Sequence, residues 1–566
     1  MLAVVSTRRS QTGVLLVTLG FALLYTTFIA RTTFTYQGGL VGTLFDDSLI
    51  SLRYADNLAS GHGLVWNRGE TPRVEGYSNL GWTLVMSVVM LLFSKAHAPI
   101  VVGAIAAVTL LACGSAVRRI LRIAGSSMAI QLAGMAIVLA YYPLVFWTLR
   151  GMEVGLLALL VLSAAEIALR PPPIDGHAAR REVATLSWLA GLGFLTRNDS
   201  LVLFVVIFAY ALRDRGVRRH ALVAAVPLAL CVLGQLTFRY AYYGELVPNT
   251  YVLKMTGVPL LQRLSRGLDA FADTLAPLAW LASIAAAAAV STTTPRPVRR
   301  PLALGLGLAA VQSCYLIWIG GDAWAFDHSN RFVAAGVPLL MAGVVAAAPE
   351  CVRFFESAPA GAVFIALNIV GLETLWLFPV FDAPSNRMLR FGWLVAAIFA
   401  AIAILTGRRS AQRQKHLCTV GAVVATIVIS SADGWRHWAT ENATYVPNDI
   451  GAARLGLELR DSLPGDAVIA AAWLGAPAYF SGLRSIDLFG KTDKHVARVL
   501  PGLPFRPGHN KMDLAYSVGT LRPDVVFLLD GADVESYGYV RVDDGTYVRR
   551  DSTTIAAGDW NPLRGR

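Results

Sequence analysis

The chain has few charged residues for its length. Charged side chains make up 15% of its 566 residues and include only six lysines, whereas 55% of all residues are apolar and the mean hydropathy is +0.54. Soluble globular proteins carry about 25% charged residues. This scarcity of charge excludes a soluble enzyme, a disordered chain and a nucleic-acid-binding protein, although the net charge of +12 alone would suit the last of these.

Cysteine is also scarce, and a nucleotide-binding loop is missing. The five cysteines lie in or beside apolar segments, at Cys113, Cys231, Cys314, Cys351 and Cys418. We therefore expect neither a disulfide framework nor a metal–thiolate site. No glycine-rich loop ends in Gly-Lys-Ser or Gly-Lys-Thr, so the sequence gives no indication of a nucleotide donor.

Long apolar runs are what the chain has in abundance. They recur from about Gly13 to Ser431 and predict a polytopic α-helical membrane protein. Arg8 and Arg9 precede the first run and no small-residue cleavage site follows it, so we interpret it as a span and not as a signal peptide. The fourteen candidates lie near 13–30, 79–94, 98–117, 128–147, 154–170, 185–196, 200–212, 220–238, 268–290, 301–319, 333–348, 359–380, 389–407 and 416–431.

Arginine clusters in the short loops set the orientation, because basic loops stay on the cytoplasmic side. If all fourteen candidates crossed, the cluster at 118–122 would lie outside. Omitting 79–94 returns every cluster to the inside and predicts about thirteen crossings, with a cytoplasmic N-terminus and an external C-terminal region. Residues 79–94 then form a helix on the outer membrane surface, within a first outside loop at about 31–97. The runs 185–196 and 200–212 are expected to be short, half-depth helices.

Two domains follow from this pattern. Residues 1–432 form the transmembrane module, and residues 433–566 form a soluble α/β domain on the periplasmic side. Within that domain, Ala467–Ala472 and Val525–Leu529 are typical of buried strands, and Asp543–Gly545 is typical of a hairpin turn.

The predicted outward loops combine acids with bases, whereas the inward loops carry mainly arginine. Ionisable residues at a membrane boundary are expensive and indicate a functional site. Structural explanations exist for single residues: Asp46 or Asp47 could cap a helix, Glu75 and Glu153 could pair with arginines, and Arg197 could anchor a helix end. Tyrosines such as Tyr243 fit an interfacial belt. None of these explains why one face collects both signs of charge.

Several of these outward motifs together resemble a known superfamily. They are the acidic pair Asp46-Asp47 after the first span, the Gly61–Asn67 turn, Val74–Asn79, Arg150–Glu153, Leu195–Arg197, Tyr243-Gly244, Pro248–Thr250, Gly320–Asp322 with Arg331, and Pro507–Asp513, which has Asn510 where glutamate is usual. The pattern is similar to that of the C-type (GT-C) membrane glycosyltransferases, and within them to the bacterial arabinofuranosyltransferases that complete cell-wall arabinan.

The resemblance implies a GT-C fold in the bacterial plasma membrane, a polyprenyl-phosphate sugar donor and a cell-envelope glycan acceptor. It also implies that Asp46 and Asp47 are catalytic. Transfer needs a carboxylate base, which we assign to Asp46 or Asp47. It also needs cations on the departing phosphate, for which Arg197, Arg239, Lys254 and Arg331 are the candidates. Polar groups that orient sugar and acceptor would come from Glu75, Tyr77, Glu153, Tyr243, Asn249, Asp322, His328, His509, Lys511 and Asp513.

Several alternatives stay open at this point. The sequence requires no cofactor, but Asp46 and Asp47 could instead hold a divalent cation. His509, Lys511 and Asp513 either reach the site or belong to a loop fixed against the membrane part. The sugar could be arabinofuranose, mannose, or another pentose or hexose moved to protein or lipid. A lipid or sugar transporter and a non-catalytic envelope scaffold are the competing classes. Membrane lipids are expected partners, and nucleic acid is not.

Overall fold

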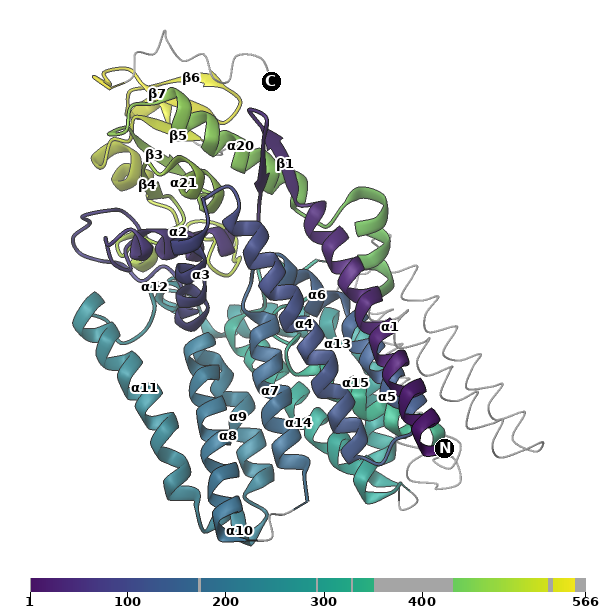
Figure 1. Cartoon of the computed structure of the whole chain (residues 1–566). Helices are drawn as coiled ribbons and strands as arrows, with labels where there is room; N and C mark the ends of the chain where they lie inside the picture. The colour runs from purple at the N-terminus through teal and green to yellow at the C-terminus, as the bar shows by residue number, and fades with distance from the viewer. Residues whose placement is uncertain are drawn as a thin grey trace.

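The computed structural model describes residues 2–171, 175–291, 294–326, 329–350, 431–527 and 533–554. Figure 1 shows a bundle of helices with a small sheet and its helices at one end, next to α2. The helix α1 begins at the opposite end of the bundle, where the short helix α10 also lies. The division into residues 1–432 and 433–566 stays a prediction.

The helices that the structure describes are α1 (Leu2–Ala30), α2 (Asp46–Ala59), α3 (Leu80–Leu92), α4 (Ala98–Ile123), α5 (Met128–Ala140), α6 (Tyr142–Leu149), α7 (Val154–Leu169), α8 (Gly176–Thr196), α9 (Leu201–Ala211), α10 (Arg215–Arg218), α11 (Ala221–Tyr243), α12 (Asn249–Met255), α13 (Leu260–Val290), α14 (Arg296–Ile319), α15 (Val337–Ala347), α20 (Val446–Ser462) and α21 (Gly475–Ser481). The strands are β1 (Thr33–Tyr36), β2 (Gly39–Gly42), β3 (Val468–Ala471), β4 (Arg484–Asp487), β5 (Val525–Phe527), β6 (Tyr539–Asp543) and β7 (Thr546–Arg549).

Three described helices are long and apolar enough to cross a membrane: Gln11–Ala30 of α1, α4 and α14. The pair α5 and α6 would form a fourth span, bent by 52°. Pro143, in the first turn of α6, fits this break because proline lacks the N–H that would continue the ladder. A multi-pass membrane protein agrees with these helices. The figure of thirteen crossings stays a prediction, since 359–380, 389–407 and nearly all of 416–431 lie outside the described residues.

Of the two runs predicted as short helices, 200–212 is one, because α9 has 11 residues, and 185–196 is not. The run 185–196 is only the second half of α8, which has 21 residues and starts at Gly176. The apolar pattern missed the first half because it is polar, but the carboxylate of Asp175 caps it by accepting a hydrogen bond from the Ala178 N–H at 2.6 Å. Helix α3, by contrast, has 13 residues, about 20 Å at 1.5 Å per residue, and is too short to cross about 30 Å of hydrocarbon. Its place on the outer surface stays a prediction.

Arginines from four of the predicted clusters, at 118–122, 170–181, 213–219 and 296–300, lie at one end of the bundle. Glu166 near the end of α7 pairs with Arg119 at 2.7 Å and with Arg170 at 2.8 Å. Arg170 in turn lines one cavity with arginines from the loop before α10 and from the start of α14. The predicted topology requires these clusters to lie on the same side of the membrane. Which compartment that side faces stays a prediction.

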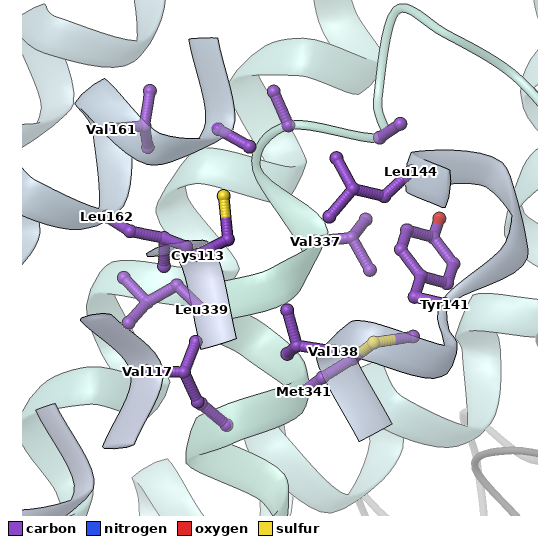
Figure 2. Close-up of a cluster of buried hydrophobic side chains, with 14 of the residues drawn as sticks. Cys113, Val117, Val138, Tyr141, Leu144, Val161, Leu162, Val337, Leu339 and Met341 are labelled. Atoms are coloured by element: carbon purple, nitrogen blue, oxygen red, sulfur yellow. The ribbon is translucent and has the colours of Figure 1, made fainter. Parts of the chain in front are cut away.

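The bundle is held by one large apolar core. Figure 2 shows part of it, where Cys113 and Val117 of α4 lie beside Val161 and Leu162 of α7, Val138 of α5, and Val337, Leu339 and Met341 of α15. All eight of these side chains are buried. Helices that are apolar on several faces can pack against one another in this way. The core keeps the ends of these helices, where the polar motifs lie, in fixed positions.

The C-terminal residues build a five-stranded sheet in the order β4-β3-β5-β7-β6. Strand β3 runs parallel to β4 and β5, and β7 runs antiparallel to β5 and β6. The two predicted buried strands are confirmed as β3 and β5, and the predicted turn joins β6 to β7. A mixed sheet of this kind with α20 and α21 agrees with the expected α/β character of the region.

Helix α2 ties the first loop to this sheet domain. The buried guanidinium of Arg53 donates hydrogen bonds to the carbonyls of Ala478 and Leu483, the latter at 2.8 Å. Trp66 donates from Nε1 to the carbonyl of Ser485 at 2.9 Å. Most of α2 is buried, including Leu49, Leu52 and Ala55. The first residues of α2 therefore have a fixed position against the C-terminal domain.

A buried ion pair makes a second link between the two parts. The fully buried Arg150, between α6 and α7, binds the carboxylate of Asp449 in α20 at 2.5 Å. We predict that Arg150→Met destabilises the protein by about 3–5 kcal/mol, because it leaves a buried carboxylate without its partner. The measurement is the midpoint of thermal unfolding in detergent.

Arg541→Ala is the control for this prediction, because Arg541 and its partner Asp544 are largely exposed. We expect it to change stability by no more than about 1 kcal/mol. Equal shifts in the two variants would contradict a structural role for the Arg150–Asp449 pair.

Candidate active site

The centre of the site is Asp47, in the first turn of α2. Its Oδ2 accepts a hydrogen bond from Arg331 at 2.9 Å, and its Oδ1 accepts one from Lys491 Nζ at 2.7 Å. Arg331 comes from the loop before α15, and Lys491 from the loop after β4. Three segments far apart in sequence thus meet at one carboxylate. Burial alone would raise the pKa of Asp47, but Lys491 and Arg331 hold it well below its usual range.

Asp47 faces a cavity of about 80 Å³. Seven of the predicted site residues line it: Asp47, Tyr77, Glu153, Arg197, Lys254, Arg331 and His509. Lys491 lines it as well and was missed by the sequence analysis. The structure brings these seven side chains together at one cavity, and their chemical roles stay predictions.

The cavity wall is positively charged. Four cations, Arg197, Lys254, Arg331 and Lys491, face two carboxylates, Asp47 and Glu153. Lys254 has no carboxylate partner among the described residues, and its Nζ lies 5.5 Å from the centre of the Phe332 ring. Burial, with Arg331 nearby, lowers the pKa of Lys254 to about 8. Lys254 is thus the cation of this wall that an anionic ligand can approach without displacing a carboxylate, whereas Arg197, Arg331 and Lys491 are each in an ion pair.

The two arginines of the cavity wall have defined supports. Asp322 binds Arg331 from behind, with Oδ2 at 3.0 Å from Nε. Arg197 donates hydrogen bonds to both carboxylate oxygens of Asp199, at 2.8 and 2.7 Å, and forms an ion pair with Glu153 at 2.7 Å. These forks leave the two guanidinium groups little freedom to turn.

The Lys491 loop is held through its backbone. The Asn249 side-chain amide donates to the carbonyls of Gly490, Lys491 and Asp493 at 2.9–3.1 Å. On the other side of the loop, Asp487 accepts hydrogen bonds from the N–H groups of Phe489 and Thr492 at 3.0 and 2.9 Å. Asn249 is thus placed to position Lys491.

His509 brings the C-terminal tail to the cavity. Its ring is buried among Trp324, Trp473 and Phe489, with centroids 5.1–5.4 Å away. Burial, with Lys491 nearby, lowers the pKa of His509 well below its usual value, so the imidazole is neutral. Nδ1 lies 3.1 Å from the Pro507 carbonyl and must carry the proton, which leaves Nε2 as an acceptor. Nε2 is buried and has no hydrogen-bond partner among the described residues.

Asp46 does not line the cavity. Its Oδ1 accepts a hydrogen bond from the Ala476 N–H at 3.0 Å, and Oδ2 is buried without a partner in the described part of the chain. Burial raises the pKa of Asp46 to about 6 despite the nearby Lys491. Of the two carboxylates that the sequence offers as a base, the structure places only Asp47 at the cavity.

Other predicted site residues make structural contacts. Glu75 and Arg239 form a buried pair at 2.5 Å, as the structural explanation of Glu75 anticipates. Tyr243 donates to the Leu64 carbonyl at 2.8 Å, and its hydroxyl lies 3.0 Å from that of Tyr77.

The rest of the predicted tail element lies away from the cavity. Lys511 is buried and donates to the Ala497 carbonyl at 2.6 Å. The Asp513 carboxylate lies 2.8 Å from Nε2 of His495 in a contact that solvent reaches. For these two the structural explanation, a fixed loop, describes the geometry better. His328 lies outside the described residues.

The geometry also bears on the divalent-cation alternative. Both oxygens of Asp47 are engaged by cationic side chains, and Asp46 turns its Oδ1 to a backbone N–H. Among the residues described here, no group of three or more His, Cys, Asp or Glu side chains is arranged to hold a metal ion. In this arrangement the two aspartates do not form a metal site.

A second cavity of about 300 Å³ adjoins the first. It shares Ser78, Arg197, Thr250, Lys254 and Phe332 with the Asp47 cavity. The rest of its wall is mostly apolar and comes from α8, α11, α14 and the segment before α12. Lys254 and Arg197 therefore stand where a polar cavity meets an apolar one.

Comparisons with known proteins agree with the sequence resemblance. Residues 435–562 match a family described as a domain of unknown function (DUF8728). The chain is 30% identical over 218 residues to a terminal β-(1→2)-arabinofuranosyltransferase of Mycobacterium tuberculosis, which covers 37% of this chain and 34% of that relative. The chain thus matches about a third of the relative's length. The resemblance to arabinofuranosyltransferases predicted from the motifs is confirmed over that part.

Among solved structures, two similar ones carry lipid phosphates. ArnT from Cupriavidus metallidurans bound to undecaprenyl phosphate is 13% identical, with a TM-score of 0.48, and the match covers 84% of this chain and 86% of that one. The oligosaccharyltransferase AglB from Archaeoglobus fulgidus, in complex with an inhibitory peptide and a dolichol-phosphate, is 12% identical, with a TM-score of 0.42. That match covers 86% of this chain and 65% of AglB.

The two aspartates should differ in their effect on stability. Asp46→Asn keeps the oxygen that accepts from Ala476 and removes a buried charge, so we expect it to stabilise the protein at pH 7.5, by up to about 3 kcal/mol. Because the pKa of Asp46 is raised to about 6 when folded, the contribution of Asp46 to stability falls as pH rises from about 4 to about 6. The gain from Asp46→Asn should therefore shrink as pH is lowered through that window.

Asp47→Asn serves as the matched comparison, measured by the same thermal unfolding. Its folded pKa is depressed, so its ion pairs with Arg331 and Lys491 contribute stability at neutral pH, and we expect this variant to be destabilised. A destabilising Asp46→Asn, or a gain independent of pH, would contradict the assignment of the buried charge to Asp46.

Proposed function

We propose that this protein is a membrane glycosyltransferase that moves a sugar from a polyprenyl-phosphate donor to a cell-envelope acceptor on the outer face of the membrane. The observation that carries this proposal is Asp47, a carboxylate held between Arg331 and Lys491 in a cavity that four cations line. A base and a phosphate-binding surface in one cavity are what transfer from a lipid phosphate requires.

The reaction needs one base and one stabilised leaving group. The acceptor hydroxyl loses its proton to Asp47 as its oxygen bonds to the anomeric carbon of the sugar. The bond between that carbon and the phosphate oxygen breaks, and the polyprenyl phosphate leaves as a dianion. Four cations line the cavity in which this dianion would form. Arg331, Lys491 and Lys254 would bind its oxygens.

Donor binding would also activate the base. In the free protein, Asp47 is a weak base because Lys491 and Arg331 lower its pKa. A donor phosphate competes for the same two cations and so weakens their hold on the carboxylate. The pKa of Asp47 then rises toward its usual value, and its power to accept a proton increases. Asp47 thus becomes an effective base only when the donor is in place.

The adjoining cavity supports a lipid donor. Its mostly apolar wall suits the first prenyl units, and Lys254 and Arg197 stand at its border with the Asp47 cavity, where the phosphate would lie. His509 Nε2, a buried acceptor on the wall of the Asp47 cavity, would receive a hydrogen bond from a sugar or acceptor hydroxyl. The donor would then lie with its lipid in one cavity and its sugar in the other.

Arabinofuranose is the sugar that we propose, because the sequence match is to an arabinofuranosyltransferase. Purified protein would be incubated with labelled polyprenyl-phosphate arabinofuranose or polyprenyl-phosphate mannose, each with cell-wall acceptors. Label in the acceptor from the arabinose donor alone supports the assignment. Transfer from the mannose donor alone would make this chain a mannosyltransferase of the same kind.

Removing the base should stop transfer without stopping donor binding. We predict that Asp47→Asn lowers the transfer rate by roughly 10²–10⁴-fold. Asp544→Asn, which changes an almost fully exposed carboxylate, should leave the rate unchanged. Donor binding should persist in Asp47→Asn, because the four cations remain. An active Asp47→Asn would contradict the role of this residue, and lipid movement without any glycoside product would indicate a transporter instead.

Donor binding should weaken at alkaline pH. Because the pKa of Lys254 is about 8, this residue loses its charge as pH rises past that value. We predict that the affinity for farnesyl phosphate, a short polyprenyl phosphate, falls about tenfold between pH 7 and pH 9. Lys254→Arg keeps its charge over this range, so its affinity should change little. The same decline in both proteins would show that another group titrates.

A further inference from the structure

A larger basic cavity lies at the end of the bundle opposite to the candidate active site. It has a volume of about 440 Å³ and is formed by the ends of α7, α8, α9 and α14 and by α10 (Figure 1). Its wall includes five arginines: Arg170, Arg213, Arg296, Arg299 and Arg300. None of its lining residues belongs to the two cavities of the proposed active site.

The preference for basic loops on one side of a membrane does not explain this arrangement. That preference concerns the number of basic residues in each loop, not their position around a common space. Here, arginines from three separate connections meet at one cavity. Like charges that converge repel one another, so their convergence calls for an anion.

The cavity holds too few acids to neutralise these arginines. Its lining includes only Glu182 and Asp214, and Asp214 Oδ1 already accepts hydrogen bonds from the N–H groups of Gly216 and Val217. Neither Arg296 nor Arg300 has an ion-pair partner among the described residues. Because Arg170 already pairs with Glu166, two positive charges of the wall lack a counterpart.

Arg299 is held in a fixed position and keeps an N–H donor that is not engaged by the described residues. Arg299 donates to the carbonyls of Ser291 and Thr294 at 2.8 and 2.9 Å, which holds its guanidinium in place. Its Nε is buried and has no hydrogen-bond partner in the described part of the chain. A guanidinium with free donors in a fixed orientation suits the oxygens of a phosphate group.

The remaining wall is apolar, which indicates an amphiphilic ligand. Ile167 and Ala168 of α7, Val183 and Leu186 of α8, and Ala303 of α14 line the same cavity. These side chains offer contacts to hydrocarbon next to the arginines. A soluble phosphate would leave this part of the wall without a partner.

We propose that this cavity binds the phosphate headgroup of an anionic phospholipid, with the start of an acyl chain against its apolar wall. Basic pockets between transmembrane helices bind anionic lipid headgroups in other membrane proteins. A bound lipid would neutralise the converging arginines and tie the ends of α7, α8 and α14 together. This site is separate from the proposed donor site and does not depend on the proposed transferase activity.

The test compares the binding of phosphatidylglycerol and phosphatidylcholine to the full chain in detergent, by native mass spectrometry. The cavity variant is Arg296→Gln with Arg300→Gln, which removes two charges that have no partner to lose. The matched control is Arg180→Gln with Arg181→Gln, two exposed arginines of α8 that do not line the cavity. The thermal midpoint of each variant in phosphatidylcholine checks that it is folded.

We expect the wild type to prefer phosphatidylglycerol, and the cavity variant to lose on the order of 30-fold in that affinity, from about fivefold per arginine. The control should stay within about twofold of the wild type. If both variants lost the same affinity for phosphatidylglycerol, the lipid would respond to basic charge in general and not to this cavity, and the proposal would be overturned. A wild type that does not distinguish the two lipids, or that binds inorganic phosphate as well as phosphatidylglycerol, would overturn it too.

Discussion

The contact of one carboxylate with two cations organises this molecule. Asp47 brings together α2, the loop before α15 and the loop after β4, which belong to the first loop, the helix bundle and the C-terminal domain. Both links are short, and all three side chains are largely withdrawn from solvent. Water screens such a site little, so the contact fixes the relative position of the three parts and also sets the charge of the cavity.

The residues behind this contact explain why so many polar side chains are buried. Asp322 holds Arg331, Asn249 holds the backbone around Lys491, and Arg150 with Asp449 holds α20 against the bundle. Helix α2 also packs closely against the backbone of α21. A Cβ on Gly475, the first residue of α21, would lie 2.0 Å from the Asp46 carbonyl oxygen, so only glycine fits there. These supports resist movement of the cations and would keep the cavity preorganised for charge that develops on a phosphate.

The site residues that could be predicted are those that belong to recognisable motifs or lie in loops whose side of the membrane the charge pattern indicates. The charge pattern of the loops predicted that Asp47, Arg197, Lys254 and Arg331 lie on the same side of the membrane. Lys491 was missed because it belongs to no recognised motif and reaches Asp47 only through the folding of the C-terminal domain. Its one signal was the rarity of lysine in an arginine-rich chain.

Other features were beyond sequence reasoning for physical reasons. Hydropathy cannot tell a charge that faces a cavity from one neutralised inside the protein, so Glu75 and Arg239 were indistinguishable from Glu153 and Arg197. Adjacent residues on a helix point in different directions, which separates Asp46 from Asp47 although both are acidic. The strands β3 and β5 were predictable because their apolar runs are short and continuous, whereas the polar first half of α8 depends on a cap that hydropathy does not register.

The most direct test of this account is a structure of the protein with a polyprenyl phosphate bound. We expect the phosphate to lie within hydrogen-bond distance of Arg331, Lys491 and Lys254, with the lipid in the adjoining apolar cavity and Asp47 released from at least one of its cations. A phosphate bound elsewhere, with both ion pairs of Asp47 intact, would contradict the claim that these cations form the donor site.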